Sequence, residues 1–160
     1  MTDLKKVFEK AGYKNVRTVL ASGNVIFATG DTDTKKISQA IVLGLQKAFK
    51  KDIIVIVRSE EDLKRMQKAD PFKKIMVSPN IRRYVTFVSG EMKPRTAKIP
   101  YSSDDSGFRI LAATPIDVFS IVDISRGKGT PDMMKFLEKE FGAEITTRNW
   151  NTVERILKIE

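Results

Sequence analysis

Two short stretches of the sequence place basic and amide side chains at the expected start of a helix. The first, "SRGKGTPD", carries Arg126 and Lys128 between glycines, and the second, "TTRNWNTVERIL", carries Arg148, Asn149 and Asn151. The first turn of a helix has backbone N–H groups without intrahelical partners, and such groups bind anions. If the two loops converge, these five side chains predict a binding site for an anionic ligand.

Each stretch also has a purely structural interpretation, which the sequence leaves open. The first lacks the spacing of a phosphate-binding loop, and Asp132 in the first helical turn would repel an anion. In the second, Trp150 begins an apolar series that continues at Val153 and Leu157, on one face of a helix. This spacing predicts that Trp150 is a core residue and that Asn149 caps the helix.

The chain contains no histidine and no cysteine. A Ser-His-Asp triad, a Cys-His pair and a zinc–thiolate site are therefore excluded. Any catalysis would use carboxylates, lysines, tyrosines or backbone donors. Because no nucleophile with a neighbouring base is recognisable, we predict no catalytic residue, no metal site and no cofactor.

Two further groups of polar side chains have both a functional and a structural interpretation. The adjacent carboxylates of Asp104 and Asp105 could bind Mg²⁺, but without a further fixed acid they are expected to be solvated. Arg83, Tyr84 and Phe87 combine a base with aromatic rings on one strand, as RNA-binding sheets do. Strand alternation puts Tyr84 on the opposite face from the other two, which favours packing in the core.

Hydrophobic periodicity predicts the elements that position these residues. In the first half it indicates helix, hairpin, helix, strand and helix, at residues 2–11, 16–28, 34–49, 53–58 and 60–69. The continuous apolar run at 53–58 predicts a strand buried on both faces. This order is that of a ferredoxin-like βαββαβ plait without its first strand, which would leave backbone groups in the sheet unpaired. A later segment, a partner chain or residues upstream of Met1 could fill that gap.

The second half is less regular. Strands are expected at 82–90, 108–113, 116–123 and 143–146, with helices at 131–141 and at the C-terminus. The polar connection Glu91–Gly107 has no apolar period, and we expect it to be the least ordered internal segment. The predicted fold is one α+β domain over residues 1–160, with halves at about 1–70 and 80–160.

The chain is basic, with a net charge of +9, and the charge is uneven. Residues 1–80 carry 16 Lys and Arg against 9 Asp and Glu. This distribution fits an anionic partner such as nucleic acid, a nucleotide or phosphate. Because the lysines are scattered and not clustered in one run, the charge by itself favours a role in solubility. No apolar run approaches the roughly 18 residues of a membrane span. We expect a cytoplasmic protein without a membrane partner.

Several blocks of the sequence resemble one bacterial family. The blocks "GYKNVRTVLASGNVIF", "VRSEEDL", "ADPF" and "LEKEFGAEITTRNWNTVERIL" are similar to members of domain of unknown function 1697. Members open with a strand and a stretch close to "LLRGINVGG", which this chain lacks. Gly127 and Gly129 stand where members tend to have serine and leucine. The resemblance implies an α+β fold with ferredoxin-like elements and implies no reaction.

The sequence therefore supports three hypotheses of function. The first, which we favour, is non-catalytic binding of an anionic ligand. The second is an enzyme that uses carboxylate or lysine chemistry. The third is an interaction or assembly domain in which the incomplete sheet takes a strand from another chain, as in a homo-oligomer.

Overall fold

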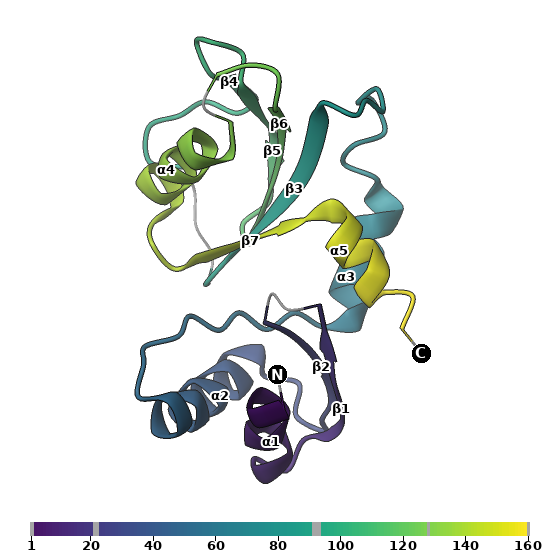
Figure 1. The fold of residues 1–160 in the computed structure, drawn as a ribbon, viewed down its shortest axis with the longest axis vertical. Helices are drawn as coiled ribbons and strands as arrows, with labels where there is room; N and C mark the ends of the chain where they lie inside the picture. The colour runs from purple at the N-terminus through teal and green to yellow at the C-terminus, as the bar shows by residue number, and fades with distance from the viewer. Residues whose placement is uncertain (1, 21–22, 91–93, 128, 160) are drawn as a thin grey trace. The chain divides into compact units, whose positions relative to one another are not determined.

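The computed structural model describes residues 2–20, 23–90, 94–127 and 129–159, and Figure 1 shows its helices and strands. The chain forms two compact units, one ending at Ser59 and the other beginning at Glu60. Each unit combines helices with antiparallel strands, so the fold class is α+β, as predicted. Among the described residues, no helix is both long and apolar enough to cross a membrane.

The first unit consists of two helices and one hairpin. Its elements are α1 (Thr2–Lys10), β1 (Lys14–Val19), β2 (Asn24–Ala28) and α2 (Thr34–Phe49). Strands β1 and β2 pair antiparallel, as the alternating pattern predicts. The Asp33 side chain caps α2 by accepting hydrogen bonds from the first-turn amides, which otherwise lack helical partners. The order helix, hairpin, helix is therefore confirmed.

The core of the first unit lies between its helices and its strands. The apolar stripe predicted for α2 is buried, and it packs with one residue from α1 and one from β1. The buried residues of this core are Phe8, Val16, Ile37, Ile41 and Leu45. Half-buried residues from β2 and from the segment after α2 complete it, namely Val25, Phe27, Val55 and Val57.

The strand expected at 53–58 does not form. Residues 52–59 run without turn or bend but belong to no sheet among the described residues. Val55 and Val57 pack on the core, whereas Ile54 is 52% exposed, so burial on both faces is also wrong. The apolar sequence is suited to a strand, but a strand also requires a neighbour to donate and accept its ladder hydrogen bonds. No described segment pairs with this one.

The second unit is a five-stranded antiparallel sheet with helices on both faces. The strand order is β4-β5-β6-β3-β7. In chain order the elements are α3 (Glu60–Ala69), β3 (Ile81–Val88), β4 (Tyr101–Ser102), β5 (Phe108–Ala113), β6 (Asp117–Asp123), α4 (Thr130–Phe141), β7 (Ile145–Asn149) and α5 (Trp150–Ile156). Strand β7 extends three residues beyond the predicted end, so that Arg148 and Asn149 lie in the sheet.

The two faces of this sheet carry different cores. Helix α4 covers one face and packs Met133, Leu137 and Phe141 against alternate residues of the strands. Helices α3 and α5 lie on the opposite side (Figure 1). There Trp150 is only 3% exposed and contacts two phenylalanine rings edge-on, with centroid distances of 5.1 Å to Phe72 and 6.5 Å to Phe119. The prediction that Trp150 is a core residue is confirmed.

The polar connection Glu91–Gly107 is more structured than its composition suggests. Residues 91–93 lie outside the described residues. The rest contains β4, which pairs with β5. Residues Thr96 and Ala97 donate three hydrogen bonds to the buried Glu140 carboxylate of α4. One buried acid on another element, which no local pattern reveals, thus attaches this segment to α4.

Candidate functional site

A cavity of about 400 Å³ opens in the second unit, on the face of the sheet opposite α4. Its position follows from strand alternation, because Ile121 on β6 points away from the α4 core that holds its neighbour Val122. The lining residues are Ile81, Ser102, Ser106, Phe108, Arg109, Ile121, Asp123 and Arg126. This volume lies within the range of ligand pockets in other proteins.

Strand register brings the basic side chains of this face into one row. Ser102 on β4 lies opposite Arg109 on β5, Arg109 lies opposite Ile121 on β6, and Ile121 lies opposite Arg83 on β3. Directly opposed residues on neighbouring strands share one face of a sheet. The row thus has one isoleucine, Ile121, with one arginine on each side of it, Arg109 and Arg83. Arg109 is exposed, and its guanidinium makes no hydrogen bond or ion pair with any described residue.

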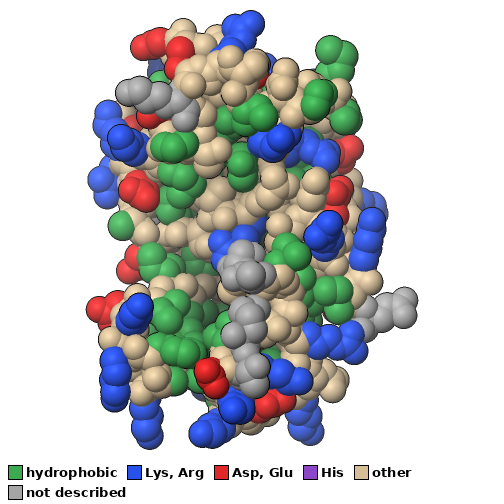
Figure 2. Space-filling model, in the orientation of Figure 1, with side chains coloured by type: hydrophobic (Ala, Val, Ile, Leu, Met, Phe, Trp, Pro, Cys, Tyr) green, Lys and Arg blue, Asp and Glu red, His purple; other side chains and the backbone are tan. Residues whose placement is uncertain are grey.

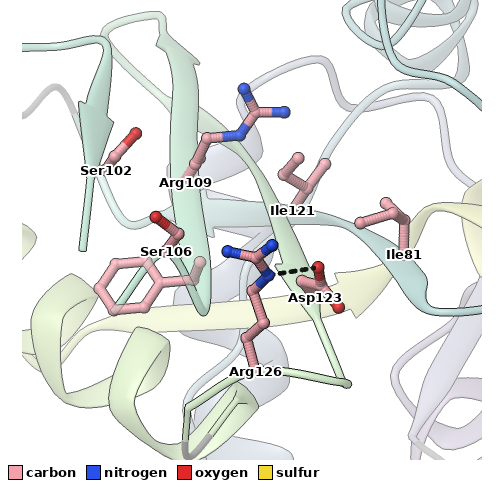
Figure 3. A pocket seen from close by; sticks show the side chains of 8 residues that line it. Ile81, Ser102, Ser106, Arg109, Ile121, Asp123 and Arg126 are labelled. Atoms are coloured by element: carbon pink, nitrogen blue, oxygen red, sulfur yellow. Dashed lines mark ion pairs between the residues drawn. The ribbon is translucent and has the colours of Figure 1, made fainter. Parts of the chain in front are cut away.

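Arg126 enters the same cavity from the loop after β6. Its Nε lies 3.6 Å from Oδ2 of Asp123, and its two terminal nitrogens have no partner in the described part of the chain. The pKa of Asp123 is lowered by hydrogen bonds from the hydroxyl and the backbone N–H of Ser125, and further by Arg126. Figure 3 shows Arg109, Arg126 and Ser106 around one opening, with Asp123 paired to Arg126. The cavity therefore holds two cations and one ionised carboxylate.

The loop that carries Arg126 is attached to the loop before β5. The Asp105 carboxylate accepts hydrogen bonds from the backbone N–H of Gly107 (2.9 Å) and from the hydroxyl of Ser103 (2.8 Å), which lower the pKa of Asp105. Gly127 has φ 55°, and a Cβ at this position would overlap the Asp105 carboxylate. Asp105 is exposed, as expected of a solvated carboxylate, and it is also hydrogen-bonded within its loop. Its contact with Gly127 gives a physical reason for glycine beside Arg126.

The predicted site residues at the start of α5 mostly have partners within the protein. Arg148 is half-buried and donates from one terminal nitrogen to the hydroxyl of Thr146 (2.7 Å) and the carbonyl of Thr147 (2.9 Å). Burial lowers the pKa of its guanidinium. The Asn149 side chain caps α5 by accepting from the backbone N–H of Asn151, as expected for a helix cap. The contacts of Arg148 and Asn149 thus connect β7 and the start of α5 within the protein.

The structure unites only part of the predicted site. Arg126 lines the cavity, and Lys128 lies outside the described residues. Asn151 joins the same face through Arg83, whose guanidinium donates to the Asn151 side-chain oxygen at 3.3 Å. Arg83 also lies over the Phe72 ring, with its guanidinium carbon 5.8 Å from the ring centroid. It thereby links Asn151 to the strand row that contains Arg109.

Sequence reasoning missed Arg109, Ser102 and Ser106. The one local signal for Arg109 is its place between the buried Phe108 and Ile110, which predicts that it faces away from their core. Its neighbours on that face depend on how β5 pairs with β4 and β6, and no local pattern encodes that pairing.

Among the described residues, no group of three acidic side chains lies close enough together to bind a metal ion.

One face of the molecule shows how the basic side chains are distributed. Figure 2 shows Lys and Arg spread over the visible face among acidic and apolar groups. On this face the positive charge is thus dispersed and not gathered into one patch.

The sequence profile of one family matches residues 1–107 of the chain, and its description is "Protein of unknown function (DUF1697)". The chain belongs to this family. The matched range includes the first unit, α3, β3 and β4, and it ends before Arg109. The similar blocks near the C-terminus, which contain Arg148 and Asn149, lie beyond that range. Neither a curated protein nor a solved structure matches the chain.

Proposed function

We propose that this member of the DUF1697 family binds a phosphate-bearing anionic ligand in the cavity on the β4-β5-β6 side of the sheet. The observation that carries the proposal is that Arg109 and the terminal nitrogens of Arg126 meet at one opening and have no partners among the described residues. Unpartnered guanidinium groups are strong donors to phosphate oxygens, and they often bind them in pairs.

The charges around the cavity favour an anion over a cation. Two guanidinium groups outnumber the single carboxylate of Asp123, and that carboxylate is already paired with the Nε of Arg126. The hydroxyls of Ser102 and Ser106 lie at the same opening and supply neutral donors. Ile81 and Ile121 give the cavity an apolar wall, which suits a ligand that carries more than a bare phosphate group.

Binding without chemistry is the simplest role for these groups. A general base acts best when its pKa lies near the working pH, and the pKa of Asp123 is lowered from its ordinary range. The serines at the cavity have no histidine or cysteine nearby, because the chain contains neither residue. The unpartnered guanidinium groups thus support binding of a phosphate more than attack on one.

Isothermal titration of the full chain with inorganic phosphate and with a nucleoside diphosphate tests the proposal. We expect Arg109→Ala and Arg126→Ala each to weaken binding by about tenfold or more, because each removes charge-assisted hydrogen bonds. The matched control is Lys135→Ala, which removes one exposed positive charge from α4 on the opposite face of the sheet. Affinity for the diphosphate should also fall between about 50 and 200 mM salt.

The proposal fails if both arginine variants bind the probes as tightly as the unsubstituted chain does. It also fails if Lys135→Ala weakens binding as much as they do, because attraction to net charge alone would then explain the affinity. Circular dichroism of each variant distinguishes lost binding from lost folding.

A further inference from the structure

Asp123 is the one carboxylate among the described residues that line the cavity proposed to bind phosphate. Its Oδ1 accepts hydrogen bonds from the backbone N–H and the hydroxyl of Ser125. Its Oδ2 accepts no hydrogen bond from any described residue, and the Nε of Arg126 lies 3.6 Å from it. Figure 3 shows this carboxylate beside the guanidinium group of Arg126. One carboxylate oxygen at the cavity can therefore accept a hydrogen bond from a ligand.

A carboxylate weakens the binding of a phosphate unless the ligand also offers it a donor. Phosphate oxygens are negatively charged acceptors, so they repel an ionised Asp123. Hydrogen bonds from the hydroxyl and the backbone N–H of Ser125 lower the pKa of Asp123, which keeps the carboxyl group ionised at neutral pH. A hydroxyl group beside the phosphate of the ligand would turn this repulsion into an attraction, because it would donate to Oδ2.

We propose that the ligand of this cavity is a phosphorylated sugar or polyol, with its phosphate on Arg109 and Arg126 and a neighbouring hydroxyl on Asp123. This inference rests on the phosphate site proposed above and names the chemical class that the site selects. The selectivity comes from the mixed charges of the lining, since the two arginines require an anion and the carboxylate requires a donor next to it.

The neutral part of the lining suits a small hydroxylated carbon skeleton. The hydroxyls of Ser102 and Ser106 lie at the opening, and each can donate one hydrogen bond and accept others. Ligand hydroxyls have the same two capacities, so they match serine better than a bare phosphate does. Ile81 and Ile121 supply an apolar wall for the C–H groups of the skeleton.

The same lining disfavours two other ligands that carry a donor for Asp123. An ammonium group would lie close to the guanidinium groups of Arg109 and Arg126, which together outnumber the single carboxylate. A nucleobase is commonly bound by stacking on an exposed aromatic ring. Phe108 is the one aromatic residue in the described lining, and it is only 6% exposed because it packs in the core beneath α4.

Isothermal titration of the full chain with glycerol 3-phosphate and with propyl phosphate tests the inference. The two esters share a three-carbon skeleton and differ only in two hydroxyl groups. We expect glycerol 3-phosphate to bind about tenfold more tightly, because a hydrogen bond to a charged acceptor is a strong one. In Asp123→Asn this ratio should fall to about twofold or less, because the amide no longer offers a charged acceptor.

Inorganic phosphate is the third probe, and Asp123→Asn should change its binding in the opposite direction. We expect its affinity to rise roughly threefold, because the substitution removes a like charge from the cavity. If Asp123 acted only by positioning Arg126, the same variant would weaken the binding of all three probes alike, and that result would overturn the inference.

Asp104→Asn is the matched control. It removes an exposed carboxylate from the loop before β5 that does not line the cavity, so it should change each affinity by less than about twofold. Circular dichroism of both variants confirms that they are folded.

Equal affinities of the unsubstituted chain for the two esters would overturn the inference. Tighter binding of 3-aminopropyl phosphate than of glycerol 3-phosphate would also overturn it, in favour of an amine. Tenfold tighter binding of adenosine 5′-monophosphate than of ribose 5-phosphate would overturn it in favour of a nucleotide. In each case, binding that still depends on Arg109 and Arg126 would leave the proposed phosphate site standing. Absence of binding to every phosphate probe would overturn both proposals.

Discussion

Glu140 is the buried group on which the attachment of residues 95–97 to α4 depends. Its side chain is 2% exposed and accepts three hydrogen bonds: from the Thr96 backbone N–H (2.7 Å), the Thr96 hydroxyl (2.7 Å) and the Ala97 backbone N–H (2.8 Å). The Arg95 backbone N–H also donates to the Glu140 carbonyl, at 3.1 Å. We predict that removing the negative charge of this carboxylate destabilises the second unit.

The size of the effect follows from the pKa of Glu140. Hydrogen bonds from the Thr96 and Ala97 backbone lower this pKa from 4.5 to about 2. A difference of about 2.5 pH units between unfolded and folded chains corresponds to about 3 kcal/mol of unfolding free energy. Because the folded pKa is the lower one, this stabilisation is complete above pH 4.5. It is lost as the pH falls from there towards about 2.

Urea denaturation of the unsubstituted chain and of Glu140→Gln measures this contribution. An amide directs its NH₂ donors at some of the N–H groups that Glu140 binds, so we expect a loss of roughly 2–4 kcal/mol at neutral pH. The difference between the two proteins should shrink as the pH is lowered to about 3. Other carboxylates with lowered pKa values, such as Asp105 and Asp123, titrate in both proteins and cancel.

Glu138→Gln is the matched control, because Glu138 is exposed on the same helix and should show little effect. A difference between Glu140→Gln and the unsubstituted chain that stays constant from neutral pH to about pH 3 would refute the reasoning. The loss would then come from packing alone and not from stabilisation of the charged form.

Two more predictions concern residues that the structure shows in close contact. Trp150→Ala should lower the unfolding free energy by roughly 3–5 kcal/mol, because it leaves a cavity between Phe72 and Phe119. Urea denaturation measures this loss, and a value below about 1 kcal/mol would contradict the prediction. Gly127→Ala should lower the unfolding free energy by roughly 1–3 kcal/mol, because φ at this position is positive and the new Cβ would displace Asp105. Titration with phosphate should also show weaker binding to this variant. Unchanged stability and unchanged affinity would show that the loop adapts freely to the substitution.

Local sequence patterns were sufficient wherever the interaction itself is local. The stripe Ile37, Ile41 and Leu45 and the Asp33 cap specify α2, because residues three or four apart share one face of a helix and a cap bonds only to the next turn. The burial of Trp150 was predictable for the same reason. These features depend on neighbours a few positions along the chain.

Features that depend on pairing between distant segments could not be predicted in this way. The run at 53–58 has the apolar, β-branched character of a strand, yet a strand exists only when another segment supplies hydrogen-bond partners. The attachment of residues 95–97 likewise required Glu140, more than forty positions away. The residue types of a segment thus indicate which secondary structure suits it. Whether that structure forms depends on a partner segment far away in the sequence.

The candidate site shows the same division. The residue types alone excluded histidine and thiol chemistry, because composition fixes which functional groups exist, and they made an anionic ligand the favoured hypothesis. Which arginines meet was decided by register: β5 pairs with β6 so that Arg109 shares a face with Arg83, and the loop after β6 brings Arg126 to the same cavity. In a sheet, a shift of one residue would turn Arg109 to the opposite face. Only the tertiary structure, which selects one register by burying Phe108 and Ile110 under α4, could determine that arrangement.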